Sequence, residues 1–408
     1  MQAQPTLTTT QVTLGQGRLD YDNRARVAFH QDGAPVAIYN VEDQGAHIQR
    51  YRSGTDWVAE GEPLSFPGLF FMDFVIVNGA YFILAKGSKG HYPEGPTLIT
   101  NYENILYFLK ADRDGRVQWQ RALMGHEGTE GGKYFLCSYS FTGQLGYDGR
   151  FFHVFSETCG NFASPESGYD VHQGDAYFLL DEQGQVLPEA SHLWTSSHSS
   201  LPTLATGDVG EGFTLTVGDG SPWGMNFYYY EHGKRRTQQV IFPDQDRLPY
   251  ANMYGVARSS TDAGIHGGIV KIGEFLYTVI ATLPVEQHPI LEQSKDLLFI
   301  KFRPDGTVVD EHWLGRTTGL DESVPHLIRW GNQLLLSYIL KTGQYEWDYR
   351  MRYALLTTEG RYSQEALSTE LYLDWQSRFF RYPNGDIGLV TSRPYRNDVA
   401  ITRFSGGH

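Results

Sequence analysis

Apolar residues alternate with polar ones in short segments that come in pairs, and each pair is joined by a turn containing glycine. Alternation with a period of two, flanked by turn residues, predicts a β-hairpin. Seven such hairpins recur along the chain at intervals of roughly 45–70 residues. They read "RVAFHQDGAPVAIYNV", "DFVIVNGAYFILAKG", "SFTGQLGYDGRFFHVFSE", "TLATGDVGEGFTLTVGDG", "GIVKIGEFLYTVIATL", "HLIRWGNQLLLSYIL" and "RFFRYPNGDIGLVTSR".

A second hairpin follows most of these units, for example "ILYFLKADRDGRVQWQRAL" and "LLFIKFRPDGTVVDEHWLG". Two consecutive hairpins form a four-stranded antiparallel sheet, and seven such sheets predict an all-β protein. In this repeat count and turn placement the chain resembles the seven-bladed β-propeller superfamily, without the Trp-Asp or Gly-Gly signatures of particular propeller families. The resemblance implies a single domain over residues 1–408.

The two ends of the chain fit this interpretation. The last repeat stops after "VAITRF", its third strand, and the N-terminal segment "TLTTTQVTLG" has no hairpin partner of its own. We therefore expect a strand near Thr8–Leu14 to complete the last blade beside Val399–Phe404. Closure of this kind removes a free sheet edge that would otherwise favour aggregation.

The composition narrows the range of partners. A net charge of −14 argues against nucleic acid and anionic membranes, and no apolar window reaches a membrane-spanning length. The start of the chain has no basic and apolar signal-peptide pattern, so the compartment is left open between the cytoplasm and secretion after removal of a signal. We expect a monomer that binds a small molecule or a saccharide.

The two cysteines, Cys137 and Cys159, cannot form a disulfide framework. Folding their hairpin about Asp148 sets them directly opposite each other, at a separation that permits a disulfide. The alternative is a bulge that shifts the register and leaves two unrelated cysteines.

The candidate chemistry lies in the longer loops, which a propeller places on one face. Long loops gathered on a rigid scaffold usually carry function. We expect His172 and His198 to act as general base and acid, with Asp175 beside them and a tyrosine, Tyr254 or Tyr229, as proton donor. Propeller polysaccharide lyases use such residue types, and the similarity extends to fold and residue type only. For any single histidine, ordinary hydrogen bonding in a loop is the alternative.

A ligand would need further contacts on the same face. Arginines can bind the carboxylate of a uronate by bidentate hydrogen bonds, and aromatic side chains can stack on sugar rings. Hydrophobic packing between loops is the other interpretation of the aromatic residues. The predicted ligand-binding residues are Asp219, Trp223, Arg258, Trp347 and Arg393, with Tyr345, Tyr349 and Tyr395 nearby.

Four histidines precede or begin inner strands: His126, His198, His266 and His326. Imidazoles converging on the axis could hold a divalent metal, most simply through His198, His266 and His326. Their unequal distances from the hairpin turns favour the other interpretation, a polar lining of the axis. We expect one common axial cavity to contain His172, Asp175, His198, Asp219, His266 and His326.

Two classes of function are compatible with these patterns. The first is a carbohydrate-active lyase or hydrolase with one active site at the axial mouth, or a metal-dependent enzyme acting on a small molecule. The second is a non-catalytic propeller that binds sugar or protein. A lectin would repeat the same pocket in each blade, whereas these loops differ from blade to blade, so the sequence favours an enzyme with one site.

Overall fold

The computed structural model describes most of the strands and turns. The described residues are 5–14, 25–54, 57–91, 102–125, 128, 134–136, 142–162, 170–192, 199–218, 224–243, 264–282, 295–315, 321–341, 349–364, 366–369, 371, 373, 377–392 and 398–406. All regular structure within them is β-strand. None of the described segments is a helix of the length and apolarity that crossing a membrane requires.

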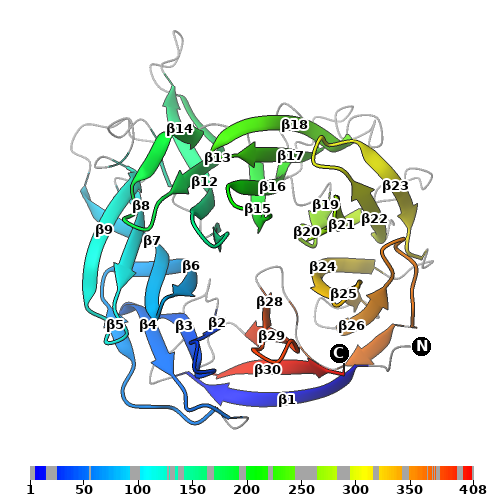
Figure 1. Cartoon of the computed structure of the whole chain (residues 1–408), viewed down its shortest axis with the longest axis horizontal. Coiled ribbons are helices and arrows are strands. Elements are labelled where there is room, and N and C mark those ends of the chain that lie inside the picture. Colours follow the sequence, from blue (N-terminus) through cyan, green and yellow to red (C-terminus); the bar gives the residue numbers. More distant parts are fainter. Residues whose placement is uncertain are drawn as a thin grey trace.

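The described strands form seven antiparallel sheets arranged in a ring (Figure 1). Each sheet is a blade, and its strands follow one another from the axis outward. The protein is a seven-bladed β-propeller.

The strands of the first three blades are, from the axis outward, as follows. Blade 1 contains β2 (Arg26–Phe29), β3 (Pro35–Val41), β4 (Gly45–Arg50) and β5 (Leu64–Phe66). Blade 2 contains β6 (Leu69–Val77), β7 (Ala80–His91), β8 (Tyr102–Ala111) and β9 (Val117–Met124). Blade 3 contains β10 (Tyr134–Phe135) and β11 (Gly143–Tyr147), both paired with β12 (Phe152–Phe162), then β13 (Asp170–Leu180) and β14 (Val186–His192).

The remaining blades repeat this order. Blade 4 contains β15 (Ser199–Thr206), β16 (Glu211–Gly218), β17 (Gly224–Glu231) and β18 (Lys234–Pro243). Blade 5 contains β19 (Gly264–His266) and β20 (Val270–Ile272), both paired with β21 (Phe275–Thr282), then β22 (Asp296–Phe302) and β23 (Val308–Trp313). Blade 6 contains β24 (Asp321–Trp330), β25 (Gln333–Lys341), β26 (Tyr349–Leu356) and β27 (Leu367–Thr369).

Blade 7 is built from both ends of the chain. It contains β28 (Arg378–Arg381), β29 (Ile387–Ser392) and β30 (Asp398–Ser405), and its outermost strand is β1 (Thr6–Thr13). The register places Leu7 opposite Phe404 and Val12 opposite Val399. The expected closure by the N-terminal strand is therefore confirmed.

The hydrophobic core lies between neighbouring blades, because the two faces of each sheet pack against different neighbours. In blade 3, Phe152 and Val154 belong to the apolar cluster shared with blade 2. Phe155 and Tyr177 belong to the cluster shared with blade 4. This explains why the second and third strands of the blades are apolar on both faces.

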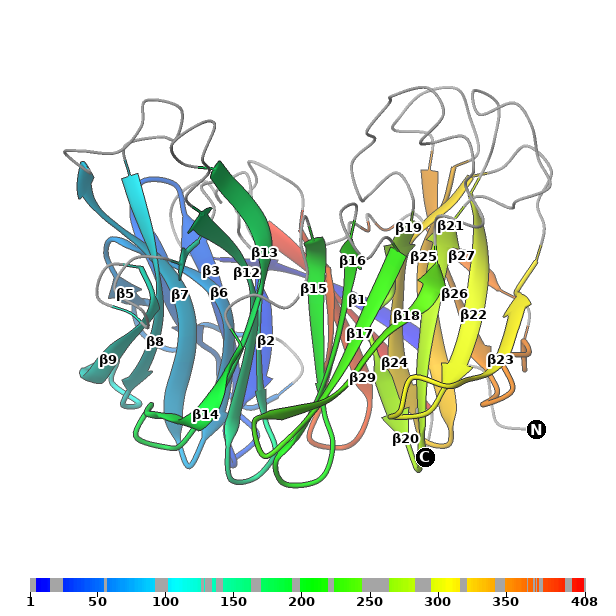
Figure 2. The same ribbon diagram turned by 90° about the horizontal axis from the view of Figure 1, so that it is seen from above.

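The two flat sides of the ring differ in their connections. The turns that join the first strand to the second and the third to the fourth lie on one side, which we call the tight-turn face; they lie at the lower edge of Figure 2. The connections between the second and third strands, and those between blades, belong to the opposite side, which we call the long-loop face. The sequence predicted short turns on one side of the ring and longer loops on the other, and this strand order assigns the two kinds of connection to opposite sides.

The environment of Cys159 agrees with the predicted disulfide but corrects the predicted register. Cys159 is buried in β12 and is disulfide-bonded. Its backbone partner is Phe135 rather than Cys137, because Gly143 pairs with Ser156 near the turn while Phe135 pairs with Cys159 beyond it. The innermost position of blade 3 is thus divided into two strands, β10 and β11, and the hairpin does not keep one register. Cys137, the chain's other cysteine, lies outside the described residues.

We expect no titratable thiol in the native protein purified without reductant, and two after denaturation and reduction. The Cys159→Ser variant should lose about 2–4 kcal/mol of the free energy of unfolding, since a disulfide chiefly restricts the unfolded chain. Thiol titration and urea denaturation measure these two quantities. Two titratable thiols before reduction would contradict the prediction.

Candidate functional site

The innermost strands surround the axis of the ring, and neighbouring ones contact each other (Figure 1). Several of them are irregular. In blades 2, 4 and 6 the innermost strand carries a register shift just before a buried or half-buried polar residue: Asp73, Thr203 and His326. In blades 3 and 5 the innermost position is divided between two short strands. Bulges bend a strand and redirect a side chain, and they are frequent beside active sites.

Two of the predicted histidines lie on neighbouring inner strands. His266 ends β19, His326 lies within β24, and the Leu327 N–H donates a hydrogen bond to the Gly267 carbonyl oxygen at 2.9 Å. His266 Nδ1 accepts a hydrogen bond from the Gly268 N–H at 3.2 Å, so a neutral ring carries its proton on Nε2. Both imidazoles are buried. The inner strands of blades 5 and 6 therefore bring the backbone segments of two histidines close together, although these residues lie far apart in the sequence.

The backbone before His326 is strained. Val324 has φ of +50°, in the left-handed region that β-branched residues rarely adopt. The register shift between Ser323 and His326 spans this residue. The His326 ring then lies edge-on to Phe379 of β28, with the ring centroids 6.5 Å apart. Strained backbone of this kind persists where the surrounding structure holds it, often at functional positions.

Asp73 forms a second ionisable centre near the axis, which the sequence analysis did not identify. Its Oδ1 lies 3.9 Å from Nε of Arg26 on β2, and its Oδ2 accepts a hydrogen bond from the Leu145 N–H of β11 at 2.8 Å. The charge of Arg378 on β28 also acts on it. One carboxylate thus interacts with the inner strands of blades 1, 3 and 7.

The environment of Asp73 changes its acidity. Burial raises the pKa of the carboxyl group, and this effect outweighs the opposing influence of Arg26, the Leu145 N–H, Arg378 and the Phe74 N–H. A carboxyl group that retains its proton more readily than usual is suited to proton donation. The signal in the sequence was a single charged residue in an otherwise apolar strand, "LFFMDFVIV".

Asp175 occupies a different position from the histidines. It lies on β13, the third strand from the axis, and it is fully buried. Its direct cross-strand neighbour is Glu157 of β12, whose side chain is also buried. Both face blade 4, as do Phe155 and Tyr177 of the same strands. The backbone of His172 belongs to β13 opposite Gly160.

Tyr229, the alternative proton donor, is engaged elsewhere. It lies on β17, and its hydroxyl group donates a hydrogen bond to Glu211 Oε1 at 3.1 Å. Burial and this carboxylate raise the pKa of Tyr229 to about 12. Because Glu211 begins β16 beside the tight turn of blade 4, the hydroxyl group belongs to the tight-turn side. Of the two tyrosines considered as proton donor, Tyr254 therefore remains the prediction.

The other predicted residues lie outside the described part of the chain, and their roles stay predictions. They are His126, His198, Asp219, Trp223, Tyr254, Arg258, Tyr345, Trp347, Arg393 and Tyr395, together with the side chains of His172 and Tyr349. Within the described residues no group of three His, Cys, Asp or Glu side chains has the arrangement of a metal site. The predicted metal ligands His266 and His326 would need His198 to complete a set of three.

A buried polar network on the tight-turn face has catalytic residue types but a different role. His153 Nε2 lies 2.9 Å from Asp148 Oδ2, and His153 Nδ1 lies 2.7 Å from the Tyr177 hydroxyl group. The side chains of Asp148 and His153 are completely buried. Asp148 also accepts a hydrogen bond from the Gly210 N–H of the next blade at 2.6 Å. No ligand can reach these groups, so the network connects blades 3 and 4.

Comparisons with known proteins give a likeness of shape alone. No family model matches the chain, and no curated protein matches its sequence. A solved protein of unknown function from Dyadobacter fermentans shares 10% identity and a TM-score of 0.45, over 97% of this chain and 99% of that one. The catalytic domain of a Coprinopsis cinerea α-L-arabinofuranosidase shares 8% identity and a TM-score of 0.35, over 64% of this chain and 90% of that one.

A puromycin-hydrolyzing peptidase from Mycobacterium tuberculosis shares 13% identity and a TM-score of 0.44, over 96% of this chain and 58% of that one. Identities and TM-scores this low say nothing about activity.

Proposed function

We propose that the protein is a carbohydrate-active enzyme, a lyase or a hydrolase, with one active site at the axial mouth of the long-loop face. The observation that supports this best is the set of bulges in the inner strands of blades 2, 4 and 6, each just before Asp73, Thr203 or His326. Irregular inner strands that differ from blade to blade favour a single asymmetric site over repeated equal ones.

The residue types match the chemistry of a uronate lyase. In β-elimination a base removes the proton next to the carboxylate, the bond to the leaving sugar oxygen breaks, and a carbon–carbon double bond forms. A proton donor then completes the leaving hydroxyl group. His172 and His198 are the predicted base and acid with Tyr254, while His266, His326 and Asp73 are further proton-transfer groups. Arginines such as Arg258 and Arg393 would neutralise the substrate carboxylate.

A hydrolase would use water in place of elimination and would need two carboxyl groups flanking the glycosidic bond. Asp73, with its raised pKa, is suited to the acid role. The two reactions are separated by their products, because elimination alone creates a double bond that absorbs ultraviolet light.

The test is a panel of uronate-containing and neutral polysaccharides, assayed for ultraviolet absorbance and for new reducing ends. Both signals together identify a lyase, and reducing ends alone identify a hydrolase. His326→Ala and Asp73→Asn should each lower kcat by roughly 10²–10⁴-fold. The control is His312→Ala, since His312 lies on outer strand β23 and donates a hydrogen bond to the Gly360 carbonyl oxygen. This variant should keep full activity.

Absence of both products across the panel, together with binding of a saccharide, would reject the enzyme and favour the binding module. Elemental analysis of the same preparation tests the metal-dependent alternative. One equivalent of a divalent metal per chain, lost in the His266→Ala variant, would favour it.

A further inference from the structure

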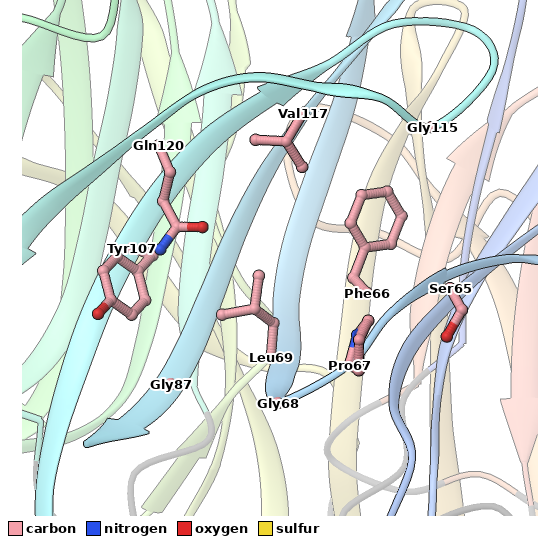
Figure 3. Close-up of a pocket in the computed structure, with 10 residues that line it drawn as sticks. All are labelled: Ser65, Phe66, Pro67, Gly68, Leu69, Gly87, Tyr107, Gly115, Val117 and Gln120. Atoms are coloured by element: carbon pink, nitrogen blue, oxygen red, sulfur yellow. The ribbon is translucent and has the colours of Figure 1, made fainter.

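A pocket lies between blades 1 and 2, and its lining includes residues of their outermost strands, β5 and β9 (Figure 3). It exists because the outermost strands of the two blades differ in length. β5 has three residues, whereas β9 has eight. Part of the face that blade 2 turns toward blade 1 is therefore left uncovered. The resulting pocket has a volume of about 360 Å³, within the lower range of small-ligand sites.

A glycine shapes one wall of this pocket. Tyr107 of β8 lies across Gly87 of β7, and a Cβ atom on Gly87 would come within 2.6 Å of Cε2 of the Tyr107 ring. Glycine is thus required for the ring to lie flat over the neighbouring strand. Tyr107 is 6% exposed, so the ring is held firmly in place. The wall is preformed, which reduces the entropy lost when a ligand binds.

The lining combines apolar surface with uncharged hydrogen-bonding groups. Leu69 and Val117 supply aliphatic surface, and Val117 is 48% exposed despite being a large apolar residue. Gln120 and Ser65 are exposed and supply an amide and a hydroxyl group. None of the lining residues is charged, although the chain as a whole carries a net charge of −14.

We propose that this pocket is an accessory binding subsite for neutral sugar units. A sugar ring has an apolar C–H face that packs on aromatic and aliphatic surface, and hydroxyl groups that bond to amides and hydroxyls. An anionic ligand would find no cationic partner among the lining residues. A purely apolar ligand would cover Gln120 and Ser65 without satisfying them. The proposal rests on the proposed function, because a polymeric substrate bound at the axis would be held at this subsite as well. Sugar binding at the subsite itself does not depend on catalysis.

The test measures binding alone, by calorimetric titration of the full chain with neutral oligosaccharides and with uronate oligosaccharides. To remove any axial contribution, it is carried out in the His266→Ala/His326→Ala background. Neutral oligosaccharides should bind, and uronate oligosaccharides should bind at least tenfold more weakly. Gln120→Ala should weaken neutral-sugar binding about tenfold, through the loss of one or two hydrogen bonds.

Gly87→Ala should also weaken binding, because the added methyl group displaces Tyr107. The matched control is Gln238→Ala, an exposed glutamine on outer strand β18 of blade 4, which should bind as tightly as the background protein. Binding that is unchanged in both Gln120→Ala and Gly87→Ala would overturn the proposal. So would a preference for uronates, or no binding to the background protein. If the parent protein forms neither product across the polysaccharide panel while the background protein binds neutral sugars here, the axial enzyme is rejected and this subsite stands.

Discussion

Replacing Asp148 with alanine should lower the free energy of unfolding by about 3–5 kcal/mol, the usual loss when one partner of a buried hydrogen-bonded charged group is removed. His153 would lose the carboxylate that orients it, and three backbone N–H groups would lose their acceptor: Arg150, Phe151 and Gly210. Because the Gly210 N–H belongs to blade 4, the contact between blades 3 and 4 should weaken as well. Urea denaturation followed by tryptophan fluorescence measures the change.

The same carboxylate predicts a dependence of stability on pH. Burial alone would raise the pKa of Asp148, but the hydrogen bonds from His153 and the three backbone N–H groups outweigh burial and lower it. An acid whose pKa is lower in the folded protein stabilises the fold above its unfolded pKa of about 3.9. This stabilisation is lost as the pH falls through the folded pKa. Asp148→Asn should therefore lose less stability than the parent protein between neutral and acidic pH.

Asp181 provides the matched control. It holds a similar turn in blade 3 by accepting hydrogen bonds from the N–H groups of Gln183 and Gln185. Asp181→Ala should cost only about 1 kcal/mol, as for ordinary exposed hydrogen bonds. If Asp148→Ala and Asp181→Ala lost the same free energy of unfolding, the buried network of Asp148 would add no stability beyond that of an ordinary turn.

Replacing His198 with alanine should abolish any activity of the protein while leaving its stability nearly unchanged. The predicted position at the end of a loop contributes little packing, whereas loss of a proton-transfer group costs roughly 10²–10⁴-fold in rate. The turnover number and the urea midpoint are measured on the same preparation.

His192 is the natural counterpart, six residues earlier in the chain. It lies on β14, donates a hydrogen bond to the Gly233 carbonyl oxygen at 2.7 Å and packs against Tyr230. His192→Ala should therefore lower stability and keep activity, the reverse pattern. A His198→Ala variant with normal turnover would remove His198 from the active site.

The fold was predictable because its signals are local. Each hairpin carries its own turn chemistry, as at Asn78 and Gly79, which both adopt the positive φ angles that a two-residue hairpin turn requires. Apolar alternation then sets the faces of the strands. The cysteine hairpin departed from this rule because β10 and β11 divide one strand position, and alternation alone contains no information about such a break.

The candidate site was less predictable, because its contacts join distant parts of the chain. Asp73 acquires its raised pKa from burial against blades 1, 3 and 7, and no sequence spacing indicates that Arg26 and Leu145 will meet it. His266 and His326 were expected on inner strands because they lie beside apolar hairpin segments, and they belong to β19 and β24. Asp175 was expected at the end of the long loop of blade 3, whereas it lies within β13, fully buried and opposite Glu157.

The closure of the ring by β1 also constrains how the protein can be made. Thr9 and Thr402 lie 393 positions apart in the sequence, yet their hydroxyl groups are 3.2 Å apart. The ribosome therefore synthesises one strand of this sheet, β1, long before the other three. Throughout translation the first strand has no partner, and contacts so distant in sequence form slowly. The composition of β1 suits a strand that stays unpaired for this time. The threonine-rich "TLTTTQVT" is less prone to aggregate than an apolar strand of equal length would be.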